Sequence, residues 1–195
     1  MPLISRYMHN LDTITIGSAG RLVPIKDFNL MVEIARIICK QRENVRFILA
    51  GDGPDREHII EKIKSYGLDD RFILTGHIQN MSSFYNSIDI YLNTSIHEGI
   101  PMTILEAMSY GLIVVAPHVG GIGEIIVNDE IGIIVKDREI DSFIQVLNEL
   151  IEMPEKIKRI GSLARCHVEK YYSNISMVKA YCHLYKETMT LGVDA

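Results

Sequence analysis

Residues 101–116 read P-M-T-I-L-E-A-M-S-Y-G-L-I-V-V-A, and this stretch decides the fold. Its first part predicts a helix over residues 101–110, with apolar residues on the core side, and Gly111 ends that helix. Residues 113–116 then form a nearly pure apolar strand, which is typical of a strand covered on both faces of a sheet. A helix followed at once by such a strand indicates a parallel α/β sheet.

The same alternation of strands and helices extends in both directions along the chain. Further strands are expected at residues 13–17, 45–50, 71–74, 89–92 and 132–135. Helices are expected around 30–38, 54–66, 81–87, 140–151, from 154 onward and at 176–189. We therefore predict one Rossmann-like domain over residues 13–190, a doubly wound parallel sheet of about six strands with helices on both faces. Residues 1–12 are expected to be a flexible extension and residues 191–195 a frayed tail.

Composition excludes several classes of protein. The 195 residues are 47% hydrophobic and 23% charged, as in soluble globular proteins, and no apolar run approaches the about 20 residues that span a bilayer. The net charge of -5 argues against a nucleic-acid binder that relies on bulk electrostatics. Three cysteines without a C-x-x-C pair predict neither a disulfide framework nor a zinc site. With no secretion signal in the sequence, the expected location is the cytoplasm.

In parallel α/β sheets, ligands bind outside the carboxyl ends of the strands. The informative loops are therefore those expected to begin at Gly17, Gly51, Gly76, Asn93, Pro117 and Lys136. In the first loop, Gly20 allows close approach of a ligand, and Arg21 and Lys26 precede a helix. A guanidinium fork, an ammonium group and a helix N-terminus together suit a diphosphate. The competing interpretation of Arg21 and Lys26 is two solvated surface cations.

The loop after the second strand contains Gly51-Asp52-Gly53. It resembles the start of a dinucleotide fingerprint, but Arg56 stands where a third glycine is required. We therefore favour a tight strand-to-helix turn, in which Pro54 is the first helical residue.

The loop after the fourth strand carries two carboxylates, Glu98 in the loop and Glu106 within the helix. They can contact two parts of one polyhydroxylated ligand, while the free N–H groups of residues 100–103 face an anionic group. Spacing alone also allows Glu106 to be a surface glutamate and Glu98 a first-turn acid. His97 and His118 are interpreted as solvated or hydrogen-bonding side chains, and no residue spacing suggests a metal site.

Four segments in this order resemble the carboxyl-terminal, nucleotide-sugar-binding domain of the retaining glycosyltransferases of family 4, which have the GT-B fold. The segments are G-R-L-V-P-I-K-D-F from Gly20, A-G-D-G-P from Ala50, E-G-I-P-M-T-I-L-E-A-M from Glu98 and A-P-H-V-G-G-I-G-E-I-I from Ala116. The sequence departs from the commonest pattern at Ile100-Pro101, in place of a Phe-Gly pair, and at Ile113, in place of a proline. Neither departure changes a charged position.

The resemblance implies a role for each matching residue. Arg21 and Lys26 would bind the donor diphosphate, Glu98 the sugar hydroxyls and Glu106 the ribose. Arg21, Lys26 and Glu98 are therefore the expected catalytic residues. The donor site is expected to comprise these residues with Gly20, His77, Ile78, Gly99, Ile100, Pro101, Met102 and Thr103. The donor would be a nucleoside-diphosphate sugar such as a UDP- or GDP-sugar, with no metal or other cofactor.

The resemblance also implies a second, amino-terminal Rossmann-like domain that supplies the acceptor site and that this chain lacks. The chain is thus expected to be the donor-binding half of a transferase for polysaccharide or glycolipid synthesis, inactive alone. The intact enzyme is expected to be cytoplasmic, with peripheral contact to the inner face of the membrane left open. Two alternatives remain: a nucleotide-sugar-binding module that acts by itself, and half of a sugar-nucleotide epimerase of the same fold.

Overall fold

The computed structural model of the chain describes residues 13–191. The expected extension at residues 1–12 and residues 192–195 of the expected tail lie outside this range. The strands are β1 (Ile14–Ala19), β2 (Val45–Ala50), β3 (Phe72–Gly76), β4 (Ile90–Leu92), β5 (Ile113–Pro117) and β6 (Ile133–Val135). The helical elements are η1 (Pro24–Lys26), α2 (Phe28–Gln41), α3 (Arg56–Ser65), α4 (Met81–Tyr85), α5 (Met102–Ser109), α6 (Ile122–Ile125), α7 (Ile140–Glu152), α8 (Pro154–Tyr171) and α9 (Asn174–Leu191).

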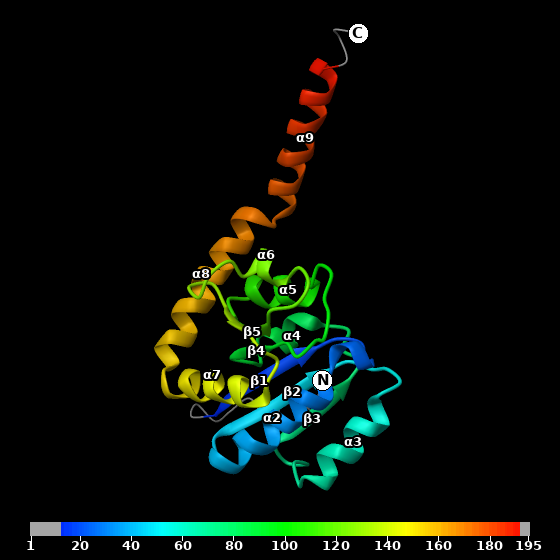
Figure 1. Cartoon of the computed structure of the whole chain (residues 1–195), viewed down its shortest axis with the longest axis vertical. Helices are drawn as coiled ribbons and strands as arrows, with labels where there is room; N and C mark the ends of the chain where they lie inside the picture. The colour runs from blue at the N-terminus through cyan, green and yellow to red at the C-terminus, as the bar shows by residue number, and fades with distance from the viewer. Residues whose placement is uncertain (1–12, 192–195) are drawn as a thin grey trace.

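The strands form one parallel sheet in the order β3-β2-β1-β4-β5-β6, flanked by helices (Figure 1). The predicted Rossmann-like sheet of about six strands is thus confirmed. Strand β1 pairs with both β2 and β4, so the order reverses between β1 and β4. In such sheets the ligand site lies at the carboxyl ends of the two strands that flank the reversal. The loops that follow β1 and β4 therefore meet at the expected site.

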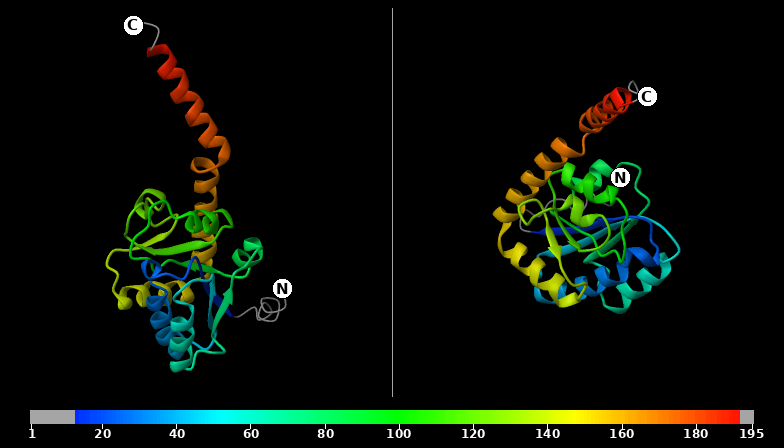
Figure 2. Two further views of the ribbon diagram at one scale, coloured as in Figure 1. Left: turned by 90° about the vertical axis from the view of Figure 1, so that its right-hand side faces the viewer. Right: turned by 45° about the horizontal axis from the view of Figure 1, so that its top comes forward.

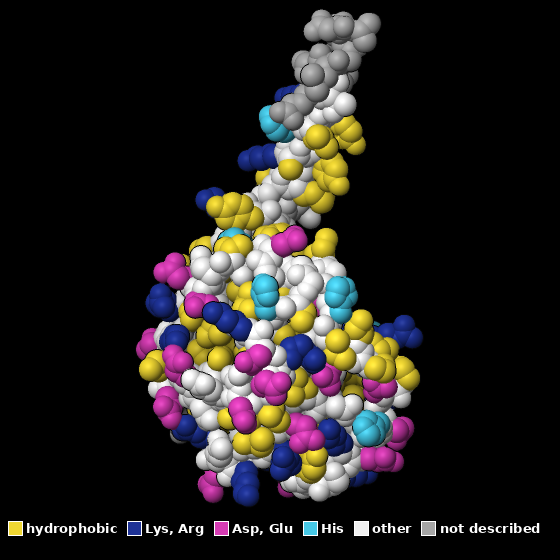
Figure 3. Space-filling model, viewed as in Figure 1, with side chains coloured by type: hydrophobic (Ala, Val, Ile, Leu, Met, Phe, Trp, Pro, Cys, Tyr) yellow, Lys and Arg dark blue, Asp and Glu magenta, His cyan; other side chains and the backbone are white. Residues whose placement is uncertain are grey.

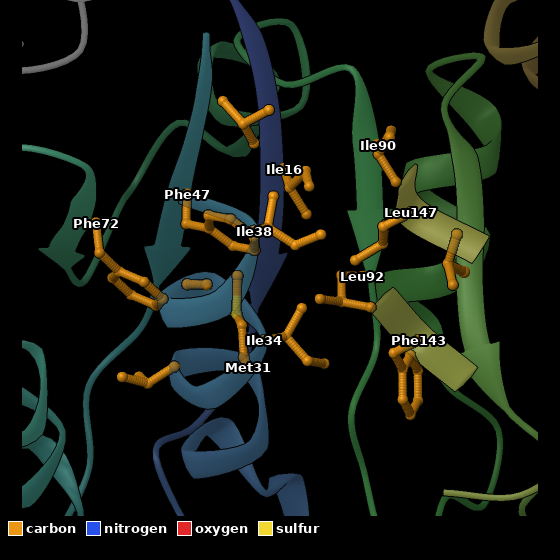
Figure 4. Close-up of a cluster of buried hydrophobic side chains, with 14 of the residues drawn as sticks. Ile16, Met31, Ile34, Ile38, Phe47, Phe72, Ile90, Leu92, Phe143 and Leu147 are labelled. Atoms are coloured by element: carbon orange, nitrogen blue, oxygen red, sulfur yellow. The ribbon is translucent and has the colours of Figure 1, made fainter. Parts of the chain in front are cut away.

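Two apolar clusters cover the two faces of the sheet. On β5, Ile113 and Val115 belong to the cluster formed with α2 and α7, whereas Val114 and Ala116 belong to the cluster formed with α4, α5 and α6. Figure 4 shows the first cluster, in which side chains of α2 and α7 pack on β1, β2 and β4. Because successive strand residues point to opposite faces, both clusters need apolar residues at every β5 position. This explains the apolar run at 113–116.

The end of β1, the start of α3 and the presence of α6 differ from the sequence prediction. Strand β1 continues to Ala19, so the first loop begins at Gly20 and not at Gly17. Helix α3 begins at Arg56 and not at Pro54, because residues 53–55 form a turn that the Arg56 N–H closes on the carbonyl of Gly53. The four-residue helix α6 was not predicted, since it is too short to show helical periodicity.

Helix α9 projects away from the sheet and its covering helices (Figures 1 and 2). Figure 3 shows hydrophobic side chains along this helix. Its exposed large hydrophobic residues are Ile175, Met177, Val178, Tyr181, Leu184 and Tyr185. Exposed apolar surface of this extent marks a contact surface in soluble proteins. No helix within residues 13–191 is long and apolar enough to cross a membrane.

Candidate functional site

The loop after β1 packs closely against the loop after β2, and glycines make this close approach possible. A Cβ atom on Gly51 would lie 1.8 Å from the carbonyl oxygen of Gly20, and one on Gly53 would lie 2.4 Å from that of Leu22. The Gly20 N–H donates to Ala50 at 2.9 Å, and these contacts exclude any side chain between the loops. The Gly-Asp-Gly segment is therefore a strand-to-helix turn that also positions the first loop.

An ion pair joins the loops after β1 and β4. Lys26 Nζ donates to Glu98 Oε1 at 2.7 Å and to Oε2 at 2.9 Å. The Glu98 residue is only 6% exposed, and the Lys26 side chain is 25% exposed. Lys26 is therefore not a free surface cation. Glu98 is not a first-turn acid either, because α5 begins at Met102.

Glu98 is held by more than Lys26. Ser95 Oγ donates to Glu98 Oε1 at 2.6 Å and Asn93 Nδ2 donates to the same oxygen at 3.2 Å. Burial alone would raise the pKa of Glu98, but the bonds from Lys26, Ser95 and Asn93 outweigh it and hold the pKa below its ordinary value. Oε1 thus accepts three bonds, while Oε2 accepts only the bond from Lys26 in the described part of the chain.

Arg138, after β6, ties these loops together. Its Nη2 atom lies 2.6 Å from Asp27 Oδ2 and donates to the carbonyl of Thr94 at 3.0 Å. Thr94 Oγ1 in turn donates to the carbonyl of Lys26 at 3.1 Å. Asp27 begins α2 in a left-handed conformation, with φ 46°, and accepts the Leu30 N–H. One guanidinium therefore links the side chain of Asp27, next to Lys26, to the backbone of Thr94 in the loop that carries Glu98.

The loop after β5 supports Glu98 from the other side. Gly120 has φ +52°, and a Cβ atom there would lie 1.7 Å from the carbonyl oxygen of Glu98. The Gly121 N–H donates to that same carbonyl at 3.2 Å. The two glycines let the two loops touch through their backbones.

A hollow of about 240 Å³ lies at the carboxyl ends of β1 and β2. Gly20, which lines it, lies close to the Lys26 side chain, because a Cβ atom on Gly20 would be 3.9 Å from Lys26 Cε. Of the predicted donor-site residues, those that line the hollow are Gly20, His77, Ile78, Thr103 and Glu106. Buried Tyr85 donates to Glu106 Oε2 at 2.6 Å, which fixes the carboxylate and leaves Oε1 available. Burial and the Glu106 bond raise the pKa of Tyr85, so its hydroxyl stays a donor.

Helix α5 begins, along the chain, between Glu98 in the loop and Thr103, which lines the hollow. No side chain caps this helix, and the Met102 and Thr103 N–H groups have no backbone acceptor within residues 13–191. Such unpaired amides attract an anion. Around them, Ile100 and Met102 are 76% and 59% exposed, whereas Pro101 is buried.

The remaining predicted residues are less constrained. Arg21 is exposed, and its side chain has no partner in the described part of the chain. Gly99 is exposed beside Glu98. Asn93, Thr94 and Ser95 were not predicted as site residues, although three polar residues directly after a buried strand are a usable signal. Nor were Tyr85 and Arg138, which no local pattern indicates. Among residues 13–191, no three His, Cys, Asp or Glu side chains are placed to hold a metal ion.

The sheet order and the loops at its reversal define a Rossmann-like domain of the kind found in GT-B enzymes. A model of the family "Glycosyl transferases group 1" matches residues 4–167, and the chain belongs to that family.

Known relatives agree with this assignment. The chain is 33% identical over 160 residues to a subunit of the phosphatidylinositol N-acetylglucosaminyltransferase of Arabidopsis thaliana, a match that covers 77% of this chain and 36% of that protein. Among solved structures it is similar to the C-terminal domain of the group 1 glycosyl transferase LpcC from Francisella tularensis, with a TM-score of 0.75, 27% identity, and coverage of 83% and 87%. Anabaena HepE in complex with UDP and glucose has the same fold, with a TM-score of 0.82, 21% identity, and coverage of 90% and 49%.

The chain spans less than half the length of its curated relatives, 36% and 39% for two of them. The matched part is the C-terminal domain of GT-B glycosyltransferases. The predicted resemblance is confirmed at this level.

Proposed function

We propose that the chain is the donor-binding half of a retaining glycosyltransferase that uses a UDP- or GDP-sugar in polysaccharide or glycolipid synthesis. The observation that carries the proposal is the buried Lys26–Glu98 pair beside a hollow lined by Glu106, at the reversal of the sheet order. HepE supports it as a protein of the same fold solved with UDP and glucose.

In this proposal the nucleoside occupies the hollow. Glu106 Oε1 accepts bonds from the ribose hydroxyls, because Oε2 already accepts the Tyr85 hydroxyl. The base lies against His77 and Ile78. The diphosphate then passes Gly20 and reaches the free amides of Met102 and Thr103 at the start of α5.

In this proposal Lys26 and Glu98 bond to each other, and each also bonds to the donor substrate. An ammonium group has three N–H bonds, and Lys26 commits two of them to Glu98. The third is available for a diphosphate oxygen. In this proposal Glu98 Oε2 accepts a sugar hydroxyl, because Oε1 already accepts bonds from Lys26, Ser95 and Asn93. The pair thus places the sugar next to the phosphate that leaves.

The chemistry that these groups supply is stabilisation of the departing nucleoside diphosphate. Arg21, Lys26 and the α5 N-terminus oppose the negative charge that develops as the bond from the sugar to the phosphate breaks. In this proposal the protein cations take the role that a metal ion has in other transferases. Retention of the anomeric configuration is part of the proposal.

The acceptor is proposed to bind to a second Rossmann-like domain that faces the site. Exposed apolar side chains at the site's mouth, Ile96, Ile100 and Met102, support such a contact, as do those along α9. The intact enzyme is proposed to work in the cytoplasm, with peripheral contact to the membrane where its acceptor is a lipid.

Calorimetric titration of the chain with UDP and GDP tests the donor site. One charge-assisted bond contributes about 1.5–3 kcal/mol, so Arg21→Ala should weaken binding roughly 10- to 150-fold. Lys26→Ala should weaken it somewhat less, and Lys26→Ala with Glu98→Gln avoids an unpaired buried charge. Lys158→Ala, at a surface pair with Glu155, is the matched control and should bind normally. Unchanged affinity in the Arg21 and Lys26 variants, or no binding by the wild type, would refute the proposal.

A further inference from the structure

A second hollow, of about 410 Å³, lies where β5 and β6 end. Pro117 and Val135 are paired in the sheet, so the next residues, His118 and Lys136, begin neighbouring loops. The His118 N–H donates to the Val135 carbonyl at 3.1 Å, which fixes the start of the first loop. This hollow shares no lining residue with the hollow at Glu106. Its volume falls in the range of about 300–1,000 Å³ typical of small-molecule sites.

The lining combines an apolar floor with a polar rim. Ile126, Val127 and Ile134 supply the apolar part, and Val127 is 58% exposed although it is aliphatic. An aliphatic side chain that is exposed at a hollow can pack against the C–H groups of a ligand.

The rim provides hydrogen-bonding groups of both kinds. His118 and Lys136 supply donors and Asp129 supplies an acceptor. Asn128 uses its Oδ1 atom to accept the Glu130 N–H at 3.0 Å, so its amide group is oriented. A phosphate or other anion here would face the Asp129 carboxylate. A neutral sugar ring, with a C–H face and hydroxyls that both donate and accept, matches the whole lining.

The loop that begins at this hollow touches the loop that carries Glu98. His118 begins the loop whose Gly120 lies against the Glu98 carbonyl. Two residues of extended chain span at most about 7 Å, so His118, which lines the hollow, lies within about 7 Å along the chain of the glycine that touches the Glu98 loop.

We propose that this hollow is a subsite for a neutral sugar residue of the acceptor. The proposal rests on the proposed transferase function. It assigns acceptor recognition to this chain as well as donor recognition.

Nuclear magnetic resonance of the ¹⁵N-labelled 195-residue chain, saturated with UDP, tests the subsite. The probes are the methyl glycosides of glucose, galactose, mannose and N-acetylglucosamine, each titrated separately. At least one should shift the amide signals of Val127, Asp129 and Lys136 in a saturable manner. Val127→Glu, a change at an exposed position, should weaken that binding at least tenfold and leave UDP binding unchanged. Glu130→Ala, next to the hollow but outside its lining, is the control and should bind as the wild type does.

The outcomes separate this inference from the proposed function. If UDP binds and none of the four glycosides shifts these signals, the subsite is refuted and the donor site stands. Inorganic phosphate is titrated in the same way. If it shifts these amide signals and no glycoside does, the subsite is also refuted, because the hollow is then an anion site. If UDP does not bind, the proposed function fails, whatever the glycosides do.

Discussion

Lys26 on the loop after β1 donates to both carboxylate oxygens of Glu98 on the loop after β4, at 2.7 and 2.9 Å. The two residues are 72 positions apart, and they meet because the sheet order places β1 beside β4. Burial of Glu98 makes the pair sensitive to the loss of either partner, since an unpaired charge in such a place is costly. The pair therefore links the stability of the domain to the geometry of its site.

The first prediction concerns this link and pH. The folded-state pKa of Glu98 lies below its ordinary value. Its stabilising effect is therefore full above the unfolded-state pKa, about 4.3, and is lost as pH falls through the folded-state pKa. At pH 7 Glu98→Gln should lower the free energy of unfolding by about 1.5–3 kcal/mol. The difference from the wild type should shrink below about pH 4.3 in urea-unfolding curves.

Glu155→Gln is the matched control for this experiment. Glu155 forms a surface pair with Lys158, and its side chain is 87% exposed. Its replacement should leave the pH dependence of unfolding unchanged. A Glu98→Gln difference that stays constant from pH 7 to pH 3 would show that the carboxylate charge does not stabilise the fold.

The second prediction concerns the backbone contact behind Glu98. Gly120 and Gly67 both have positive φ, +52° and +64°, but only Gly120 lies against another loop. Gly67→Ala should cost about 1–2 kcal/mol from the left-handed conformation alone. Gly120→Ala adds a clash with the Glu98 carbonyl, and should lower the free energy of unfolding by more than about 3 kcal/mol. Equal losses of unfolding free energy in the two variants, measured by urea unfolding, would mean that the loops move apart to accommodate the Cβ atom at residue 120 without a loss of stability.

The alternation of strands and helices was predictable because both faces of the sheet are covered, which leaves long apolar runs such as 113–116. The end of β1 was predicted wrongly because Gly17 reads as a turn residue. Gly17 lies in the strand, where it pairs with Ile48 and Tyr91. A Cβ atom there would lie 2.6 Å from a methyl group of Ile88, so glycine serves close packing and not a turn. Local pattern cannot distinguish these two reasons for a glycine.

The candidate site was predictable only in part. The sequence placed Lys26 and Glu98 in loops at the ligand-binding edge and Glu106 in the helix that follows, but the pairing of Lys26 with Glu98 depends on strand order. Arg138 illustrates the limit, because it contacts Asp27 across 111 residues and no periodicity or motif marks it. Whether the predicted residues bind a donor stays a prediction.

The third prediction tests Arg138 as a positioning residue. Arg138→Met removes the bonds to Asp27 and Thr94, which are partly buried, and should lower the free energy of unfolding by about 1–2 kcal/mol. UDP affinity should fall several-fold because the loops on both sides of Lys26 loosen. Arg165→Met, at an exposed pair with Glu169, should cost less than about 0.5 kcal/mol and leave UDP affinity unchanged. Normal UDP affinity in folded Arg138→Met would remove this role.

The fourth prediction separates ribose recognition from phosphate recognition. Glu106→Gln should weaken the binding of UDP and GDP, because one acceptor of the ribose hydroxyls is replaced by an amide that also donates. Inorganic pyrophosphate has no ribose, so its affinity should barely change in the same calorimetric series. Equal losses for the nucleotides and for pyrophosphate would mean that Glu106 supports α5, through Tyr85, and not the ribose.

The last prediction concerns turnover by the 195-residue chain. It carries a complete sheet covered on both faces, so it should fold and bind a nucleotide weakly. It should not transfer sugar at an appreciable rate, because catalysis requires acceptor and donor to be held in position within a closed cleft. Loss of positioning alone can remove about 7–11 kcal/mol of barrier lowering, far more than any single donor-site substitution.

A donor-consumption assay with mixed acceptors measures this directly. Addition of a GT-B amino-terminal domain as a separate polypeptide should restore some activity, provided that it docks against the mouth formed by Ile96, Ile100 and Met102. Ile96→Glu, at an exposed position outside the proposed donor site, should abolish that rescue, since it places a charge in the contact, while Lys158→Ala should not. Robust turnover by the chain alone would show that it is a self-sufficient enzyme and that the acceptor is held by this domain only.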